Sequence, residues 1–314
     1  MYHQKNIMKK IELKIKLLLL FVAGGVFSTQ AQQDSQFTQY MYNTSVINPA
    51  YAGSRDMLSI TGAYRAQWVG LNGAPQTNTL SMNTPVGDRT GLGITVVSDR
   101  IGPVSDTNFS TDFSYNIPVS PYARLYFGVK ASASLVSVNY NKLDNEYPND
   151  PRFQNSVEQF SPNVGAGVYL QEEKWYVGLS VPNFLKTSHF NEYKTSNLEE
   201  EFHGYLMGGY VFDLSREVQF KPAVLAKVAV GAPLQVDLSA NFLFMEKLTL
   251  GVAYRWDAAV SGMAGFQVTP GLMAGYSYDF DTTKLGNYNS GSHEVFLRFD
   301  IFDGVKPIIN ARFF

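Results

Sequence analysis

Residues 57–301 form a series of short segments in which apolar and polar side chains alternate. In residues 248–257, one face carries Leu248, Leu250, Val252, Tyr254 and Trp256, and the other carries Thr249, Gly251, Ala253, Arg255 and Asp257. Successive side chains of a strand point to opposite sides, so each segment has one apolar and one polar face. About fourteen such repeats, without helix-period stretches long enough to cover a sheet, predict a transmembrane antiparallel β-barrel with lipid outside and water inside.

The alternation also indicates where the strands lie. They are expected at residues 57–69, 76–86, 90–98, 106–119, 122–139, 161–171, 174–182, 203–214, 217–230, 233–245, 248–257, 259–269, 271–280 and 292–302. The connections at 87–89, 118–121, 171–174, 214–217, 245–247 and 269–271 are short, whereas those at 140–160, 183–202 and 281–291 are long. Outer-membrane barrels have short periplasmic turns and long extracellular loops. This segregation predicts an all-β domain over residues 56–314, with an even strand number and a short C-terminal tail.

Residues 1–31 have the composition of a secretory signal peptide. Five lysines come before an apolar run at residues 17–27, and Ser28-Thr29-Gln30-Ala31 follows that run. The run is about half the roughly 20 residues that a spanning helix needs. We therefore expect cleavage after Ala31 and no uncleaved anchor.

Cysteine content and net charge exclude several classes of protein. The chain has no Cys, which excludes disulfides, thiolate metal sites and a lipoprotein anchor. A closed barrel suits such a chain because it pairs the backbone of every strand. The formal net charge of -2 gives no reason to expect nucleic acid or another polyanion as a partner.

Ten charged residues fall on the polar faces of the expected strands and should face the lumen. They are Arg65, Arg124, Lys130, Lys227, Asp237, Arg255, Asp257, Asp279, Glu294 and Arg298. An Arg or Lys that faced lipid at mid-depth would cost about 2–4 kcal/mol, so the inward orientation is strongly favoured. These charges could form a salt-bridge network that fills a narrow interior, or they could line a conduit and grip a translocating segment.

Residues 32–55, called the N-terminal segment below, have neither strand alternation nor helix caps. The segment is rich in aromatic and amide side chains, and loops rarely keep such apolar density without a surface to cover. Two interpretations remain open: a plug packed against the barrel wall in the lumen, or a periplasmic docking site for a partner. The candidate partner-binding residues are Phe37, Tyr40, Tyr42, Asn48, Pro49 and Tyr51.

The same segment carries a resemblance to a known family. The stretches Gln36-Phe37-Thr38-Gln39-Tyr40-Met41-Tyr42-Asn43 and Asn48-Pro49-Ala50-Tyr51-Ala52-Gly53 resemble the N-terminal signature of the PorP/SprF family of type IX secretion system membrane proteins. Three later stretches are also similar: Tyr64-Arg65-Ala66-Gln67-Trp68-Val69-Gly70, Gly73-Ala74-Pro75-Gln76-Thr77, and residues 91–103. The aromatic end Ala311-Arg312-Phe313-Phe314 is similar too. The match is dense over about residues 34–104, and beyond these residues it rests on length and barrel pattern.

The resemblance implies an integral protein of a Gram-negative outer membrane of the Bacteroidetes type. It also implies a non-enzymatic role in the export or surface anchoring of a large secreted adhesin, as in gliding motility. The implied partners are that adhesin or its C-terminal secretion domain, periplasmic ring proteins of the secretion system, and outer-membrane lipid. The alternative function is an outer-membrane channel for small or hydrophobic solutes, because a barrel of this size could remain partly open.

The sequence lacks common motifs of catalytic, metal and nucleotide-binding sites. It contains no nucleophile elbow, zincin motif or phosphate-binding loop, so we expect no catalytic residue, no cofactor and no metal. An outer-membrane lipase remains a third possibility, for which His293 beside Ser292 is the pair to inspect. The carboxylates of the expected outer loops, in residues 144–158 and 199–201, lack the regular spacing of a calcium loop.

Overall fold

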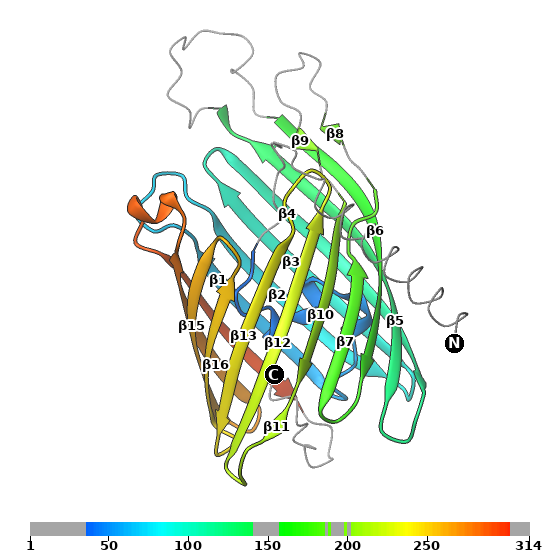
Figure 1. Cartoon of the computed structure of the whole chain (residues 1–314). Helices are drawn as coiled ribbons and strands as arrows, with labels where there is room; N and C mark the ends of the chain where they lie inside the picture. Colours follow the sequence, from blue (N-terminus) through cyan, green and yellow to red (C-terminus); the bar gives the residue numbers. More distant parts are fainter. Residues whose placement is uncertain (1–35, 141–156, 186–187, 190–197, 200–201, 302–314) are drawn as a thin grey trace, which may run out of the picture.

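The protein is a closed antiparallel β-barrel with part of the chain inside it (Figure 1). The computed structural model describes residues 36–140, 157–185, 188–189, 198–199 and 202–301. Among these residues, fourteen strands form the wall. The expected signal peptide and C-terminal tail, and most of the loop carboxylates, lie outside the described residues.

The wall strands follow one another around the ring in chain order. They are β1 (Leu58–Ala66), β2 (Gln76–Val86), β3 (Thr90–Ile101), β4 (Val104–Pro118), β5 (Arg124–Val138), β6 (Val157–Gln171), β7 (Trp175–Val181), β10 (His203–Tyr210), β12 (Val218–Ala229), β13 (Gln235–Phe244), β14 (Leu248–Arg255), β15 (Ala259–Thr269), β16 (Leu272–Asp281) and β17 (Ser292–Ile301). Three two-residue strands are also present, namely β8 (Ser188–His189), β9 (Leu198–Glu199) and β11 (Phe212–Asp213). β8 pairs with β9, and β11 pairs with β12 as a continuation of β10.

The ring closes because the first and last strands pair. Leu58 of β1 lies opposite Ile301 of β17, and the antiparallel register continues from there to Ala66 and His293. β10 pairs with both β7 and β12, so the described strands leave no open edge between the two halves of the wall. A closed ring satisfies the backbone hydrogen bonds of every strand without water, as a bilayer requires.

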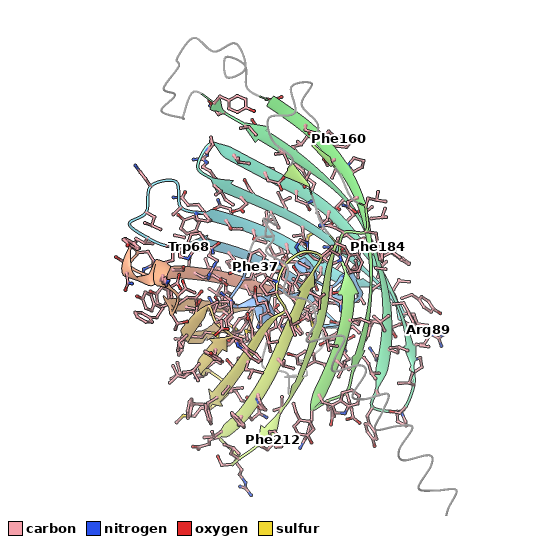
Figure 2. All side chains as sticks on the ribbon, turned by 45° about the horizontal axis from the view of Figure 1, so that its top comes forward. Phe37, Trp68, Arg89, Phe160, Phe184 and Phe212 are labelled. Carbon is pink, nitrogen blue, oxygen red and sulfur yellow. The ribbon has the colours of Figure 1, made fainter. Side chains whose placement is uncertain are left out.

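The sequence alternation determines which side of the wall each residue faces. In β5, Tyr126, Gly128 and Lys130 are buried toward the lumen, while Phe127 and Val129 between them are exposed on the outside. Figure 2 shows the same division around the barrel, with Phe160 and Phe212 on the outside and Phe37 within the ring. The exposed apolar residues on the outside of the wall would be a liability in water, but they suit contact with hydrocarbon.

An aromatic ladder crosses the outside of the wall close to its short turns. Tyr210 and Phe212 lie 4.5 Å apart, Phe220 and Phe242 lie 4.8 Å apart, and Phe244 continues the row at 6.4 Å from Phe242 (ring centroids). Such rows are typical of the girdle that marks a membrane interface. The ladder is therefore consistent with the periplasmic side that the short turns predict.

The N-terminal segment folds inside the ring, where it is drawn in blue in Figure 1. It contains three short 3-10 helices, η1 (Tyr40–Tyr42), η2 (Thr44–Val46) and η3 (Pro49–Tyr51), and another, η6 (Lys284–Asn287), lies between β16 and β17. Asn48 caps η3, because its side chain accepts a hydrogen bond from the Ala50 amide. No described helix has the length and apolar character needed to cross a membrane.

The predicted fold class is confirmed, and each of the fourteen expected strands corresponds to one wall strand. The largest difference within a strand is at residues 203–214, where β10 ends at Tyr210 and β11 resumes at Phe212. The intervening Val211 is 1% exposed and donates its amide to the Lys174 carbonyl at 2.7 Å. The register with β12 is the same on both sides of this gap, because Gly209 lies opposite Ala223 and Phe212 lies opposite Phe220, so the interruption adds no residue to the strand.

Candidate functional site

The lumen and the segment within it form the candidate functional site. Gln36 contacts the ends of β13 and β14 that adjoin outer loops, whereas Arg55 contacts Asp300 at the periplasmic end of β17. The described segment therefore runs through the lumen from the extracellular mouth to the periplasmic end, where β1 begins. The lumen, expected to hold water, is occupied by polypeptide over this length.

A cluster of buried charges holds the start of the segment. The two guanidinium nitrogens of Arg65 bind Asp279 at 2.6 Å and Glu294 at 3.0 Å. Glu294 accepts the backbone amides of Thr38 (2.9 Å) and Gln39 (3.0 Å), and the Thr38 hydroxyl donates to Asp279 at 2.6 Å. Buried carboxylates need such partners, because an unpaired buried charge is very costly. Three wall strands and the segment thus share one network.

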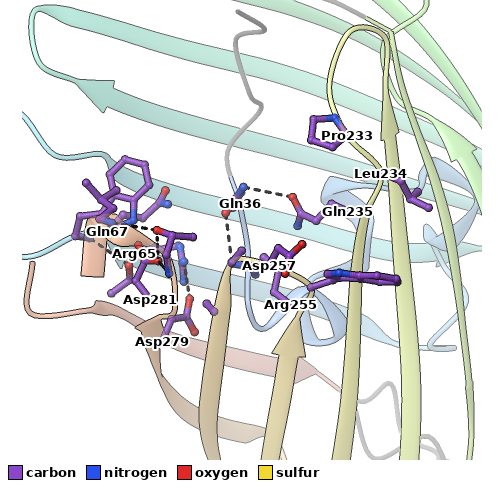
Figure 3. Close-up of a pocket in the computed structure, with 17 residues that line it drawn as sticks. Gln36, Arg65, Gln67, Pro233, Leu234, Gln235, Arg255, Asp257, Asp279 and Asp281 are labelled. Carbon is purple, nitrogen blue, oxygen red and sulfur yellow. Dashed lines mark hydrogen bonds and ion pairs between the residues drawn. The ribbon is translucent and has the colours of Figure 1, made fainter. Parts of the chain in front are cut away.

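A second ion pair lies beside Gln36. Arg255 of β14 donates Nε to both carboxylate oxygens of Asp237 at 3.1 Å, and its Nη1 donates to the Gln36 side chain at 3.3 Å. The Gln36 amide nitrogen also donates to Gln235 at 3.4 Å. Both ends of the Gln36 amide are therefore used by the wall (Figure 3).

Lys130 holds the middle of the segment. Its ammonium lies 3.5 Å from Asp112 and donates to the carbonyl oxygens of Ser45 and Val46, each at 3.2 Å. The ammonium group has three donors, and two hydrogen bonds from it reach segment carbonyls. Asp112 and Lys130 are both at least 94% buried, so the ion pair depends on the segment for part of its solvation.

A fourth network closes the periplasmic end. Asp300 binds Arg55 of the segment at 3.0 Å and Arg298 of the wall at 3.1 Å, and it accepts the Ser59 hydroxyl at 2.7 Å. The Arg298 guanidinium also lies over the ring of Tyr42, 5.9 Å from its centroid. The carboxylate of the last strand thus joins the segment to both closing strands of the ring.

Wall side chains also bind the segment through its backbone. Ser180 donates to the Ile47 carbonyl at 2.7 Å, Ser114 to that of Ala52 at 2.6 Å, and Gln171 to that of Ser54 at 3.2 Å. In the described residues, the backbone-to-backbone hydrogen bonds of the segment join its own residues, as from the Tyr51 amide to the Asn48 carbonyl. The wall therefore binds the backbone of the segment through side chains, and the segment does not become a strand of the sheet.

Glycines on the inner face of the wall make room for this path. A Cβ on Gly128 would overlap the backbone of Pro49 and Ala50, and one on Gly91 would overlap the Ala52 carbonyl. A Cβ on Gly167 would collide with the Asn48 side chain. Glycine in a strand can mark a close approach by another backbone, which is the case here. Alternation places these three glycines on the inner face, but it carries no signal that another segment of the chain approaches them, so their role could not be predicted from the sequence.

Aromatic packing completes the interior. Tyr42 stacks on Phe296 of β17 with ring centroids 4.3 Å apart, and Tyr51 meets the edge of Tyr169 on β6 at 5.5 Å. Tyr205 and Met207 on the inner face of β10 join the same core, together with Leu225 of β12. This explains why residues 203–214 are apolar on both sides: one side faces lipid and the other faces the segment.

The ten charges expected in the lumen fall into two groups. Eight are buried inside the wall: Arg65, Lys130, Lys227, Asp237, Arg255, Asp279, Glu294 and Arg298. Arg124 instead forms an exposed pair with Asp56 at the periplasmic end, and Asp257 lies exposed in the turn after β14. Arg124 and Asp257 occupy alternate positions of the kind that face the lumen. However, they lie beyond the part of the wall that encloses the segment. Lys227 places its ammonium 5.8 Å from the Tyr205 ring centroid.

The six candidate partner-binding residues line the interior. Tyr40, Tyr42, Asn48, Pro49 and Tyr51 are buried, and Phe37 is partly buried against the core. Of the two interpretations of the segment, the structure places it in the position of a plug. A periplasmic partner could contact these side chains only after the segment had left the lumen.

A cavity of about 580 Å³, called the extracellular vestibule below, opens above the first network (Figure 3). Gln36 and Gln235 contribute to its wall, together with Trp68, Trp256, Asp257 and other residues of the strand ends. Its size is that of a ligand pocket. Gln36, the first described residue of the segment, lines the vestibule, so within the described residues the vestibule is a recess in the outer face and not a passage.

The serine and histidine pair that a lipase would need is not assembled. Ser292 is buried toward the lumen and accepts a hydrogen bond from the Trp68 amide at 3.1 Å. The neighbouring His293 faces outward, where Nδ1 lies 2.7 Å from the Tyr276 hydroxyl. Adjacent strand residues point to opposite sides, so the two groups cannot act together. Among the described residues, no group of three or more His, Asp or Glu could hold a metal ion.

Solved structures similar to this chain are barrels. The CymD monoaromatic hydrocarbon channel gives a TM-score of 0.52 at 14% sequence identity, covering 90% of this chain and 96% of the channel. A Pseudomonas aeruginosa FadL homologue gives 0.45 at 13% identity, covering 89% of this chain and 96% of that one. The TodX deltaS2S3 mutant channel gives 0.47 at 10% identity, covering 88% and 96%. At these identities the likeness to CymD shows the fold alone.

Sequence comparison is more specific. No curated protein matches the chain. A family model described as type IX secretion system membrane protein PorP/SprF matches residues 29–299, which include the segment, the vestibule and the wall strands up to the last two residues of β17. An outer-membrane location follows from this family and from the closed barrel together. The resemblance noted in the N-terminal signature is therefore confirmed, and the chain belongs to the PorP/SprF family of type IX secretion system membrane proteins.

Proposed function

We propose that this barrel is a non-enzymatic part of the type IX secretion system that retains a large secreted adhesin, of the gliding-motility type, at the cell surface. The adhesin or its C-terminal secretion domain would bind the extracellular face, which comprises the vestibule and the strand ends around it. Family membership supports the secretion role. The observation that favours retention over passage is the filled lumen, in which four networks tie residues 36–55 to the wall.

The extracellular face has the features of a binding surface. Trp68 and Trp256 contribute large aromatic surface to the vestibule, and aromatic residues are enriched at protein interfaces. Asp257 and Asp281 line the same cavity, whereas the two arginines of its floor are already paired with Asp279, Glu294 and Asp237. A cationic segment of the client would complement this rim.

Purification of the intact barrel from its native membrane, with identification of the bound chains, tests the proposal. We expect a large surface protein to co-purify with the wild type, and much less of it with the double variant Asp257→Lys and Asp281→Lys. Asp88→Lys is the matched control, since Asp88 lies in the periplasmic turn between β2 and β3. Absence of any surface protein from the wild-type preparation would refute retention. Equal losses in both variants would refute a role for the vestibule.

Contacts with the secretion machinery belong to the same proposal. The periplasmic turns, such as residues 87–89 and 214–217, would meet periplasmic ring proteins, and a signal peptide over residues 1–31 would direct the chain to the Sec pathway. Docking by the N-terminal segment itself would require its release. A deletion of residues 36–53 that left every periplasmic partner attached would exclude the segment as a docking site.

The second candidate function is a channel for small or hydrophobic solutes. It is favoured by the fold shared with CymD, which is described as a monoaromatic hydrocarbon channel. A channel requires an open path past the segment, so steady conductance by the intact protein would favour this function over retention.

A further inference from the structure

The lumen binds the N-terminal segment as it would bind a peptide ligand. The wall supplies side-chain donors to carbonyls of the segment, from Lys130 to Ser45 and Val46 and from Ser180 to Ile47. It also supplies the Glu294 carboxylate to two segment amides. Contacts to backbone groups depend little on the side chains that the peptide carries. The wall therefore binds the backbone of the segment, and these contacts do not require one particular sequence.

The wall does not need the segment to complete its own hydrogen bonding. The fourteen described strands close through β1 with β17 and through β10 with β12. The segment adds no strand to this ring, and within the described residues its covalent link to the wall is at residues 56–57. Its release would expose Lys130, Asp112, Glu294 and their neighbours to water, which solvates charges well. Release of the segment would therefore leave the backbone pairing of the wall intact.

The glycines of the inner wall set the kind of polypeptide that fits. Gly128 lies against the backbone at Pro49 and Ala50, and Gly91 lies against the Ala52 carbonyl. Ala50 and Ala52 are both 0% exposed, so this part of the path admits small side chains only. On either side, Tyr42 and Tyr51 fill places against Phe296 and Tyr169.

We propose that the lumen is a polypeptide-binding site whose resident ligand, residues 36–55, is exchangeable. Once the segment leaves, the wall takes a second polypeptide of the same chemistry: small residues at alternate positions over the glycines, flanked by aromatic residues. This site goes beyond surface retention of a client, and it can be tested without one because the resident segment is itself the probe.

The test uses the full-length folded protein with a protease site inserted between residues 56 and 57. Asp56 lies at the periplasmic mouth with a side chain 57% exposed, so the protease can reach the inserted site. After cleavage, a fluorescent synthetic peptide of residues 36–55 is added, and its anisotropy is followed while the released fragment is measured by mass. We expect the labelled peptide to replace the fragment. A scrambled peptide, and a peptide with Ala50→Leu, should bind at least about tenfold more weakly, since overpacking at the glycines is costly.

Failure of exchange in a barrel that stays folded after cleavage would overturn the proposal. So would equal binding of the scrambled peptide, which would show nonspecific adsorption to the lumen. Neither result would contradict retention of the client, which is tested separately by co-purification of a surface protein with the uncut barrel.

A second measurement uses uncut protein, in case cleavage destabilises the wall. A single cysteine is introduced as Thr44→Cys in the otherwise Cys-free chain, at a buried position of the segment. Gly128→Ala should increase the rate of maleimide labelling about tenfold or more, because the three atoms nearest to the added Cβ all belong to the segment. Gly62→Ala is the matched control, since a Cβ there meets nothing within 4 Å. Equal labelling rates in the two variants would contradict an exchangeable segment.

Discussion

At the residue scale, the polar interior depends on charge networks that join the wall to the segment. Arg65, 2% exposed, pairs with both Asp279 and Glu294, and both carboxylates also bind the segment. The alternation of apolar and polar side chains, called parity here, predicted the inward position of Arg65. Parity can be read from the local sequence alone. Parity could equally have identified Asp112 and Lys221, which are also buried. Which carboxylate each cation meets depends on strand register, and a single sequence does not carry that information.

Replacing Arg65 by Met should destabilise the barrel strongly. The change leaves two buried carboxylates without their cation, and breaking a buried pair in this way costs about 3–5 kcal/mol. Arg124→Met is the matched control, because its pair with Asp56 is exposed and should contribute about 0–1 kcal/mol. Urea unfolding in lipid vesicles, followed by tryptophan fluorescence, measures both free energies of unfolding. Similar losses for the two variants would show that the Arg65 network contributes no more than a surface pair.

At the element scale, the strands were predictable and the N-terminal segment was only partly so. Each wall strand has one surface against lipid and one against the lumen, and this two-sided environment imposes the alternation that the sequence shows. The segment touches the wall on all sides, so its residues have no common face and no period. Its aromatic content indicated a surface to cover, but the choice between lumen and periplasm required the glycines at 91, 128 and 167, which become meaningful only in three dimensions.

The lipid face of a strand should be sensitive to charge according to depth. Val129 lies near the middle of β5 and is 57% exposed on the outside, next to the buried Lys130. Val129→Arg should reduce the free energy of unfolding in vesicles by about 2–4 kcal/mol, whereas Ser137→Arg, on the same face near the end of the strand, should cost about 0–1 kcal/mol. No difference between the two variants would contradict the assigned membrane depth.

At the scale of the whole molecule, the filled lumen should prevent steady ion flow. The segment occupies the interior from Gln36 to Arg55, and aromatic rings fill the space between its networks. We expect the wild type in planar bilayers to show no steady conductance, because no described recess continues past the segment. Gly128→Ala should increase the fraction of time during which the barrel conducts ions, whereas Gly62→Ala should produce no conductance. A steady wild-type pore would instead favour the solute channel.

The direction of the segment constrains the order in which the barrel assembles. Its described start lies near the outer mouth, yet the chain must return to the inner end before β1 can rise beside β17. Unlike a peptide added later to the finished barrel, the tethered segment is present while the wall strands fold, so its three tyrosines need not be threaded through a closed tube. The simpler order is for the wall to curl around a segment already in place, with the β1 and β17 seam formed last. Asp300 binds Ser59 and Arg298 at this seam and also binds Arg55 of the segment. All three contacts would then form only if the segment is in place when β1 and β17 pair.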